Sequence, residues 1–332
     1  MRAMVIPTFG GPGVLTLREL PDPQPGPGEI TIDVTHTAVG LVDVLVRRGA
    51  FPIFAPPLVP GLSVAGRVRA VSDDVTSLAP GQSVAAFTAP PTMGGYATIA
   101  RVPAPLAVSL ETSIGTVPAD AAAVAIVNGP TAYLALVDLA DVQPGDPVVV
   151  HGATGALAGM VAQLARHLGA DPLIGTVGHE GKRAHAETLG YTDVLLSTDD
   201  WVAAVRARTG GRGAAAVVDP VGGTLRRQSL DVLRPLGRLL AVGHASDEPD
   251  PPISATDLWL GNQAVLELNV GSLSASEPAR FNAAARAVMT LVAQGAILAD
   301  VGAVLPLEEA GEAHRRLEAR TAVGTMLLLA GI

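Results

Sequence analysis

The feature that most constrains the fold of this chain is a turn of small residues, His-Gly-Ala-Thr-Gly-Ala-Leu-Ala-Gly, at positions 151–159. The apolar run Val148–Val150 enters the turn, and apolar residues at helical spacing follow it. Small residues let a ligand approach the backbone closely, and the first N–H groups of a helix attract phosphate. Because another strand–helix unit follows, the pattern favours dinucleotide binding. The spacing Gly152-x-x-Gly155-x-x-Ala158 departs from Gly-x-Gly-x-x-Gly, and the alternative is a tight turn that binds no ligand.

The pattern of the chain changes near residue 120. Before that point, short apolar runs alternate with Gly- and Pro-rich turns, which predicts a compact, mostly antiparallel β-barrel. From about Ala121, strands alternate with helices, which predicts parallel βαβ units. The expected strands are Ile30–Thr35, Gly66–Val71, Ser83–Phe87, Pro147–His151, Leu173–Val177, Ala214–Asp219, Arg238–Gly243 and Gly324–Leu329, and the expected helices are Ala156–Leu168, Ala279–Gln294 and Leu307–Arg320. A chain of 332 residues exceeds the usual size of one core, so two domains are expected.

The composition excludes several classes of function. The chain has no cysteine, which excludes disulfides, thiolate metal ligands and a cysteine nucleophile. A net charge of −9 argues against binding to nucleic acid, which requires a basic face. Met1–Ile6 is typical of a first strand rather than a targeting segment, and the apolar stretch Pro118–Val137 is interrupted by Asp120, Gly129 and Pro130. We therefore expect a cytoplasmic protein with no membrane partner.

The end of the second α/β strand indicates which dinucleotide is bound. In NAD sites this strand usually ends in Asp or Glu, whereas NADP sites offer cations and small polar groups. Here Gly178 occupies the tip, and Lys182 and Arg183 follow within five residues, which favours NADPH. Two other interpretations remain: Glu180 binds the ribose or pairs with Lys182, or the two cations only solvate the start of a helix.

A series of short motifs occurs in the order and spacing of a known family. They are Phe9-Gly10-Gly11-Pro12, Pro25-Gly26-Pro27-Gly28-Glu29, Val59-Pro60-Gly61, Pro80-Gly81, Gly94-Gly95-Tyr96-Ala97, Thr131-Ala132-Tyr133, Val150-His151-Gly152-Ala153, Asp219-Pro220-Val221-Gly222-Gly223 and Gly237-Arg238-Leu239. On these motifs, nearly the whole chain resembles the zinc-independent quinone oxidoreductase branch (zeta-crystallin-like) of the medium-chain dehydrogenase/reductase superfamily.

The resemblance implies an α/β protein with two domains. A GroES-like β-barrel domain would contain both chain ends, residues 1–122 and 266–332. A doubly wound Rossmann domain, which binds NADP, would comprise residues 123–265. Members of the family commonly form homodimers at the edge of the Rossmann sheet, which in this chain is expected near Val265–Leu273.

The resemblance also gives meaning to two positions that lack metal ligands. Zinc-dependent relatives carry a cysteine just before the residue that matches Asp43, and a His-Glu pair after the segment that matches Pro60-Gly61. This chain has Val42 and Leu62 at those positions, and apolar side chains cannot ligate zinc. We therefore expect a metal-free enzyme that reduces an activated double bond, rather than one that oxidises alcohols with zinc as a Lewis acid.

The expected substrate pocket has lost polar groups that relatives carry. Gly40 replaces the usual asparagine and Leu45 replaces a frequent tyrosine. The pocket residues are then Gly40, Leu41, Leu45, Phe51, Phe54 and Leu62, which indicates a hydrophobic substrate. The candidate catalytic residues are Thr131, Asp43 and Tyr96, of which the family places Thr131 near the nicotinamide.

Structural roles are also open to several of the polar residues. Asp43 lies four residues before Arg47, so a helical salt bridge between them is expected. Tyr96 is expected to pack rather than to donate a proton. His36 and His151 are expected to be hydrogen-bonded core residues rather than catalysts.

The expected NADPH site draws on several turns. Its residues are Thr131, Gly152, Thr154, Gly155, Ala156, Leu157, Thr176, Gly178, Lys182, Ser197, Val242, Gly243, Asn269, Val270 and Gly271. The turn Thr154–Leu157 would bind the pyrophosphate, and the segment Asn269–Gly271 the nicotinamide. Ser197 stands where the family often has a tyrosine, so Lys182, the only lysine of the chain, must carry more of the charge of the 2′-phosphate.

Three functions from different classes are compatible with these features. The first is an NADPH-dependent reductase of quinones or α,β-unsaturated carbonyl compounds. The second is a repurposed fold that cyclises or rearranges a hydrophobic biosynthetic intermediate without net redox chemistry. The third is a non-catalytic NADPH-binding protein. We favour the first, because hydride transfer depends mainly on proximity and orientation and does not require the polar groups that the pocket has lost.

Overall fold

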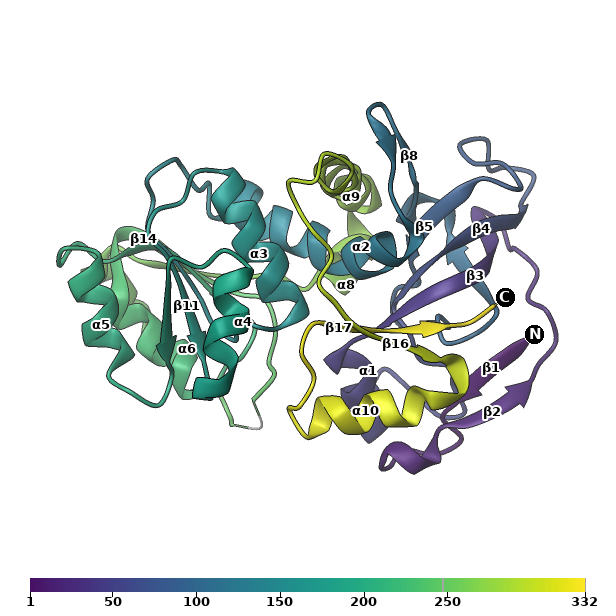
Figure 1. Cartoon of the computed structure of the whole chain (residues 1–332), viewed down its shortest axis with the longest axis horizontal. Helices are drawn as coiled ribbons and strands as arrows, with labels where there is room; N and C mark the ends of the chain where they lie inside the picture. Colours follow the sequence, from purple (N-terminus) through teal and green to yellow (C-terminus); the bar gives the residue numbers. More distant parts are fainter. Residues whose placement is uncertain (247, 332) are drawn as a thin grey trace. The chain divides into compact units, whose positions relative to one another are not determined.

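The computed structural model of the protein describes residues 1–246 and 248–331. The chain divides into two compact units (Figure 1). The barrel unit comprises Met1–Pro130 and Val270–Ile332, and the Rossmann unit comprises Thr131–Asn269.

The barrel unit is organised around one large sheet. The strands of the unit are β1 (Arg2–Val5), β2 (Thr16–Glu19), β3 (Glu29–Val39), β4 (Ser63–Val71), β5 (Ser83–Phe87), β6 (Ile99–Pro103), β7 (Ala107–Ser109), β8 (Glu111–Thr112), β9 (Gly115–Thr116), β16 (Val301–Pro306) and β17 (Thr325–Leu329). Its helices are α1 (Leu41–Arg48), α2 (Ala119–Tyr133), α8 (Val270–Ser276), α9 (Pro278–Ala293) and α10 (Ala310–Glu318), with 3₁₀ turns η1 (Pro12–Val14), η2 (Ala104–Leu106) and η6 (Leu307–Glu309).

Strand β3 holds the barrel unit together. It pairs antiparallel with β4, with β6 and with β17, and its residues Ile30, Ile32 and Val34 lie in the core of the unit. Because β17 comes from the C-terminal end of the chain, the two ends are joined in one sheet. This confirms the GroES-like domain built from both ends.

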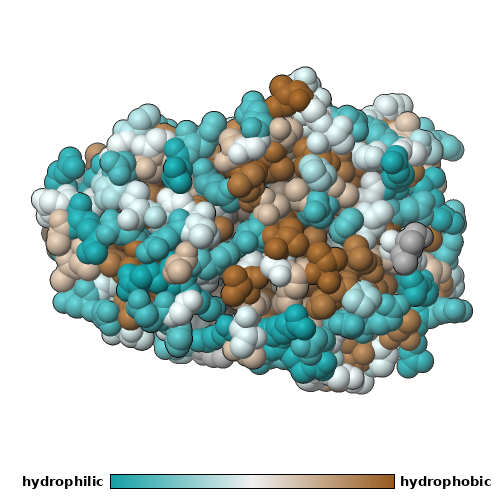
Figure 2. Space-filling model, viewed as in Figure 1, coloured by the Kyte–Doolittle hydropathy of each residue, from teal (hydrophilic) through white to brown (hydrophobic). Residues whose placement is uncertain are grey.

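Strand β16 forms one edge of this sheet, next to β17. Along β16, half-buried and exposed residues alternate, as expected for a strand with one face toward the core. Figure 2 shows apolar side chains gathered over β16 and β17, where Val304 and Leu329 are 48% and 41% exposed.

The Rossmann unit is built on a parallel sheet with the order β12-β11-β10-β13-β14-β15. Its strands are β10 (Val148–Val150), β11 (Leu173–Val177), β12 (Asp193–Leu196), β13 (Ala214–Asp219), β14 (Leu233–Ala241) and β15 (Ala264–Glu267). Its helices are α3 (Ala156–His167), α4 (Arg183–Thr188), α5 (Trp201–Arg208), α6 (Thr224–Ser229) and α7 (Ala255–Gly261), with the π-helix η3 (Leu134–Leu139) and 3₁₀ turns η4 (Glu180–Lys182) and η5 (Leu230–Val232). Helices α3 and α4 lie on one side of the sheet, and α5 and α6 on the other (Figure 1). The doubly wound Rossmann fold is thereby confirmed.

Several predicted elements differ from the structure. Strands β3 and β4 are longer than the predicted Ile30–Thr35 and Gly66–Val71, and three further elements differ as follows. Strand β14 begins five residues before the predicted Arg238, because a register shift in its pairing with β13 lets the strand continue through the Pro- and Gly-containing stretch that suggested a turn. The predicted edge segment Val265–Leu273 is a strand only to Glu267 and becomes helix α8 at Val270. The predicted helix Leu307–Arg320 consists of the 3₁₀ turn η6 followed by the shorter α10.

One helical stretch is long and apolar enough to cross a membrane by composition. It runs from Ala119 to Leu139, and 67% of its most apolar window is buried inside the protein. It contains Pro130 and passes into the π-helix η3 after Tyr133.

Candidate functional site

In the Rossmann sheet, the order in which the chain connects successive strands reverses between β10 and β13. These strands are neighbours in the sheet, yet the helices that follow them pack on opposite faces. The turns after the two strands, residues 151–155 and 220–223, therefore lie at the point of the sheet where open α/β proteins bind ligands.

The turn after β10 leads into an uncapped helix. Gly155 is the N-cap of α3 in extended conformation, and in the described chain no side chain accepts from the first N–H groups of this helix. Gly152 adopts a φ of +64°, and a Cβ there would lie 3.4 Å from Val221 of the turn after β13. The predicted cofactor residues Gly152, Thr154, Gly155, Ala156 and Leu157 therefore come together around backbone donors that no side chain of the described residues caps.

A buried histidine, His151, is the first residue of this turn. His151 is fully buried, and its ring nitrogens each lie 2.8 Å from a hydroxyl, that of Thr176 and that of Ser229. The ring also packs edge-on against Trp201, and burial lowers the pKa of His151. His151 is a hydrogen-bonded core residue, as predicted. The hydroxyl of Thr176, expected at the 2′-phosphorylated ribose, instead has its partner inside the domain.

The tip of β11 offers a cation and small residues. A Cβ at Gly178 would lie 4.0 Å from the hydroxyl of Ser197, so these two predicted ribose residues are adjacent. Lys182 follows in the 3₁₀ turn η4 and is half-buried. Glu180 forms an ion pair with Arg183, at 2.8 Å, and this hydrogen bond lowers the pKa of Glu180. Glu180 thus has Arg183 as a partner, a pair that was not predicted from the sequence.

The loops after β13 and β14 are joined by an arginine that the sequence did not single out. Arg226 donates to the buried carboxylate of Asp219, to Asp250 and to the carbonyl of Gly243. Asp219 also accepts from the backbone of Val221. The predicted cofactor residues Val242 and Gly243 therefore belong to a loop fixed beside the turn after β13. The charged residue Asp219, at the end of an otherwise apolar strand, is the sequence signal for this network.

The remaining predicted nicotinamide residues lie at helix ends. Thr131 is in α2 and is 5% exposed. Asn269 follows β15, and Val270 and Gly271 begin α8, where Gly271 accepts a hydrogen bond from the hydroxyl of Ser274.

Asp43 lies at the centre of a buried polar cluster in the barrel unit. Its carboxylate accepts N–H donors from Gly40 at 2.8 Å and from Gly61 at 3.0 Å, and the hydroxyl of Tyr96 donates to it at 3.3 Å. Burial raises the pKa of Asp43 from 3.8 to about 6, against the opposing effect of these donors. Asp43 thus connects the start of α1 to the turn before β4.

The structure contradicts one prediction for this cluster. Among the described residues, no ion pair joins Asp43 to Arg47, because the buried Arg47 side chain pairs with Glu318 of α10. Tyr96, named as a candidate catalytic residue, is fully buried and its hydroxyl contacts Asp43 and lies 3.2 Å from His314. Burial raises the pKa of Tyr96 well above its ordinary value, so the hydroxyl stays protonated at neutral pH.

Half of the predicted substrate pocket forms one cluster. Phe54 is buried with Val46 and Met93, and Phe51 and Leu62 pack against them. Of the others, Gly40 lies before α1, Leu41 is exposed and Leu45 is half-buried on that helix. Met93 was not predicted, because a lone methionine in a Gly- and Pro-rich loop carries no sequence signal for a pocket.

The positions of zinc ligands in relatives are apolar here. Val42 is 40% exposed on α1, and Leu62 packs in the apolar cluster. Within residues 1–246 and 248–331, no group of three His, Asp or Glu side chains could hold a metal ion.

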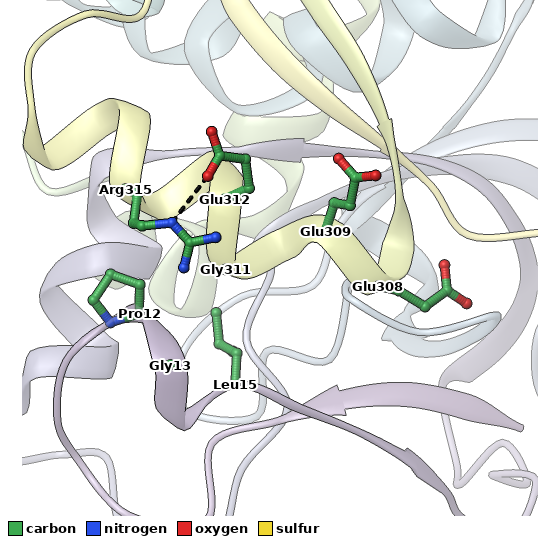
Figure 3. Close-up of a pocket in the computed structure, with 8 residues that line it drawn as sticks. All are labelled: Pro12, Gly13, Leu15, Glu308, Glu309, Gly311, Glu312 and Arg315. Atoms are coloured by element: carbon green, nitrogen blue, oxygen red, sulfur yellow. Dashed lines mark hydrogen bonds and ion pairs between the residues drawn. The ribbon is translucent and has the colours of Figure 1, made fainter.

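A surface depression of about 420 Å³ lies elsewhere in the barrel unit (Figure 3). It is lined by Pro12, Gly13, Leu15, Glu308, Glu309, Gly311, Glu312 and Arg315. Its three carboxylates outnumber its one guanidinium, which itself pairs with Glu312 at 2.9 Å. Such a lining repels phosphate, so this depression does not compete as a dinucleotide site.

Comparisons with known proteins agree with this geometry. A model of the alcohol dehydrogenase GroES-like domain matches residues 26–112, and a model of the zinc-binding dehydrogenase domain matches residues 156–290. A 2-haloacrylate reductase from Burkholderia is 31% identical, and the match covers 98% of each chain. A quinone oxidoreductase from Salmonella typhimurium is 30% identical over 96% of this chain and 97% of its own. The crystal structure of Escherichia coli quinone oxidoreductase, a complex with NADPH, superposes with a TM-score of 0.88 at 27% identity over 99% of this chain and 100% of its own.

The similarity spans both units and nearly the full length of each relative, and the zinc-ligand positions hold Val42 and Leu62. The chain therefore belongs to the quinone oxidoreductase branch of the medium-chain dehydrogenase/reductase superfamily.

Proposed function

We propose that the protein is an NADPH-dependent reductase of quinones or α,β-unsaturated carbonyl compounds. The observation that carries this proposal is the carboxyl edge of the Rossmann sheet, where the uncapped N-terminus of α3 and the small-residue turn before it offer backbone donors to a pyrophosphate. The relatives named as quinone oxidoreductases and as a 2-haloacrylate reductase support the class of reaction.

The residues of the Rossmann unit fit NADPH better than NADH. Glu180, the first acidic residue after β11 in the sequence, forms an ion pair with Arg183, and Gly178 rather than a carboxylate occupies the tip of the strand. Gly178 and Ser197 leave space beside this tip, and Lys182 supplies positive charge for a 2′-phosphate. Thr154–Leu157 would hold the pyrophosphate, and Thr131 with Asn269–Gly271 the nicotinamide. When bound, NADPH supplies a hydride to an electron-poor carbon of the acceptor.

The barrel unit contributes an apolar surface for the acceptor. Phe51, Phe54 and Leu62 pack in one cluster, and Ile53, which precedes Phe54 in the sequence, is 63% exposed. Reduction also requires a proton at the enolate or hydroquinone oxygen. Because Asp43 and Tyr96 are fully buried and hydrogen-bonded to each other, we assign this proton to water.

We further propose a cytoplasmic homodimer joined at the edge of the Rossmann sheet. Strand β15 is the edge strand, with half-buried Ala264, Val265 and Leu266. Nearby in sequence, Trp259 and Leu260 are 75% and 68% exposed, and Leu236, whose N–H donates to Asn262, is 80% exposed. A second copy of the chain would cover this apolar edge. The net charge of −9 argues against nucleic acid as a partner.

Lys182→Ala tests the cofactor assignment. We expect the Kd for NADPH to rise about tenfold, which corresponds to about 1.4 kcal/mol, while the Kd for NADH stays unchanged. Arg212→Ala is the matched control, because it removes an exposed cation from the same unit outside the proposed site. Equal effects of Lys182→Ala on NADPH and NADH would contradict the phosphate site.

Turnover is measured by the loss of NADPH absorbance with a panel of quinones and enones. We expect oxidation of NADPH by at least one of them. Tight NADPH binding without oxidation by any acceptor would contradict the proposed reductase, and would favour a rearrangement without net redox chemistry or a binding protein without turnover.

A further inference from the structure

Helix α1 and two loops of the barrel unit meet at Gly61. Its N–H donates to Asp43, and its carbonyl accepts from the N–H of Gly95 at 3.0 Å and from the hydroxyl of Thr88 at 2.6 Å. Gly61 has a φ of +101°, and a Cβ there would lie 2.6 Å from the backbone nitrogen of Tyr96. Only glycine allows this approach, so the segment 88–96 is fixed against the turn before β4.

The segment 88–96 holds a methionine in an unusual conformation. Ala89 and Met93 have φ values of +42° and +49°, in the left-handed region that residues with a Cβ rarely adopt. The N–H of Met93 donates to the carbonyl of Ala89 at 3.1 Å. Backbone strain of this kind persists only where the surroundings enforce it. Here it directs the Met93 side chain inward, where it is 2% exposed.

The Met93 side chain lies beneath the aromatic residues of the predicted pocket. It is buried with Val46 and Phe54, while Phe51 and Leu62 pack on this layer and are only half-buried. The rings of Phe51 and Phe54 meet edge to face, with centroids 6.3 Å apart. The cluster therefore has a buried lower layer and an accessible upper layer.

We propose that Met93 is a specificity-determining residue that forms the floor of the acceptor pocket and limits the size of the acceptor. This proposal rests on the proposed reductase function. The occupant is a planar conjugated ring, because the accessible layer consists of Phe51, Leu58 and Leu62, an aromatic and an aliphatic surface. The methionine side chain is unbranched and polarisable, so it adjusts to rings of different shape while its length sets the depth.

Met93→Ala tests the proposal with two quinones of different size. The measured quantity is kcat/KM for phenanthrenequinone divided by kcat/KM for benzoquinone. We expect this ratio to rise about tenfold in Met93→Ala, because the shortened side chain deepens the pocket. Met93→Leu, which restores most of the volume, should move the ratio back toward the wild-type value.

Met4→Ala is the matched control. It shortens a methionine that is 3% exposed in the main core of the same unit, so it reports what a buried cavity does without touching the pocket. Its ratio should equal that of the wild type. If Met93→Ala unfolds cooperatively and its kcat/KM ratio equals that of the wild type, the proposal is overturned.

Equilibrium dialysis of both quinones against wild-type and Met93→Ala protein without NADPH separates this proposal from the reductase function. If neither quinone oxidises NADPH with the wild type, the reductase function fails and dialysis alone decides the role of Met93. If the variant binds phenanthrenequinone more tightly relative to benzoquinone than the wild type does, the proposed role of Met93 is supported. Unchanged relative binding overturns this role.

Discussion

The two oxygens of the Asp43 carboxylate accept N–H donors from two different loops, at Gly40 and at Gly61. These donors favour the charged form, but burial disfavours it more strongly and raises the pKa of Asp43 to about 6. In the unfolded chain the same group titrates near 3.8. The folded protein therefore binds this proton more tightly, so Asp43 makes the fold less stable as pH rises from about 4 to about 6.

Asp43→Asn should remove this pH dependence. Relative to the variant, the wild type is expected to lose about 2 kcal/mol of unfolding free energy between pH 4 and pH 7, since most of the effect of a shift of about two pKa units falls in this range. Urea unfolding at a series of pH values measures the difference. Burial lowers the pKa of His314 to about 3, which affects stability in the same range, but it does so in both proteins and cancels in the difference. Parallel pH curves for the two proteins would refute the assignment.

The partner of Arg47 shows where single residues resist prediction. Four-residue spacing within α1 suggested Asp43, yet the partner is Glu318, 271 residues away along the chain. Spacing along a helix predicts an ion pair only where no residue from a distant element pairs with the same side chain. The sequence near Arg47 gives no sign that α10 packs against α1. In contrast, the burial of His151 followed from its place at the end of an apolar strand.

At the level of elements, strands in parallel sheets were the most predictable. Leu173–Val177 and Ala214–Asp219 were predicted with the bounds that the structure has, because an apolar run between polar or glycine residues has few alternatives when both faces are buried. Strand β14 was predicted too short, since Pro235 and Gly237 lie within it and a register shift accommodates them. The turn between β10 and α3 was predicted correctly, because its small residues and the flanking strand and helix are adjacent in the sequence.

Arg226 connects two of these elements and provides a prediction at this scale. In Arg226→Met the buried Asp219 would lose its guanidinium partner, and the loop at Gly243 and Asp250 would lose its anchor. We expect the free energy of unfolding to fall by about 3 kcal/mol in denaturant titrations. Arg227→Met is the matched control, because Arg227 pairs with Asp231 at the surface and should change stability by less than about 1 kcal/mol. Equal effects of the two variants would show that the network is dispensable.

For the whole molecule, the low charged fraction of 16% has a structural explanation. The parallel sheet of the Rossmann unit is buried by helices on both sides, and the barrel unit has a core of its own. Two separate cores in one chain require many apolar residues. The number of domains and their classes could therefore be predicted from length and pattern. The buried cluster around Asp43 could not, because its members come from segments that only the tertiary fold brings together.

The exposed edge of the Rossmann sheet leads to the last prediction. If a second copy of the chain covers β15, a charge placed in the middle of the apolar edge must be buried without a partner and should separate the subunits. We expect the wild type to sediment as a dimer and Trp259→Glu to sediment as a monomer at the same concentration, with NADPH binding retained in the monomer because the proposed cofactor residues lie on other loops. Ile114→Glu is the matched control, since it places the same charge at an apolar residue, 49% exposed, in the barrel unit, and it should remain dimeric. A wild type that sediments as a monomer, or a Trp259→Glu variant that remains a dimer, would show that this edge is not the subunit interface.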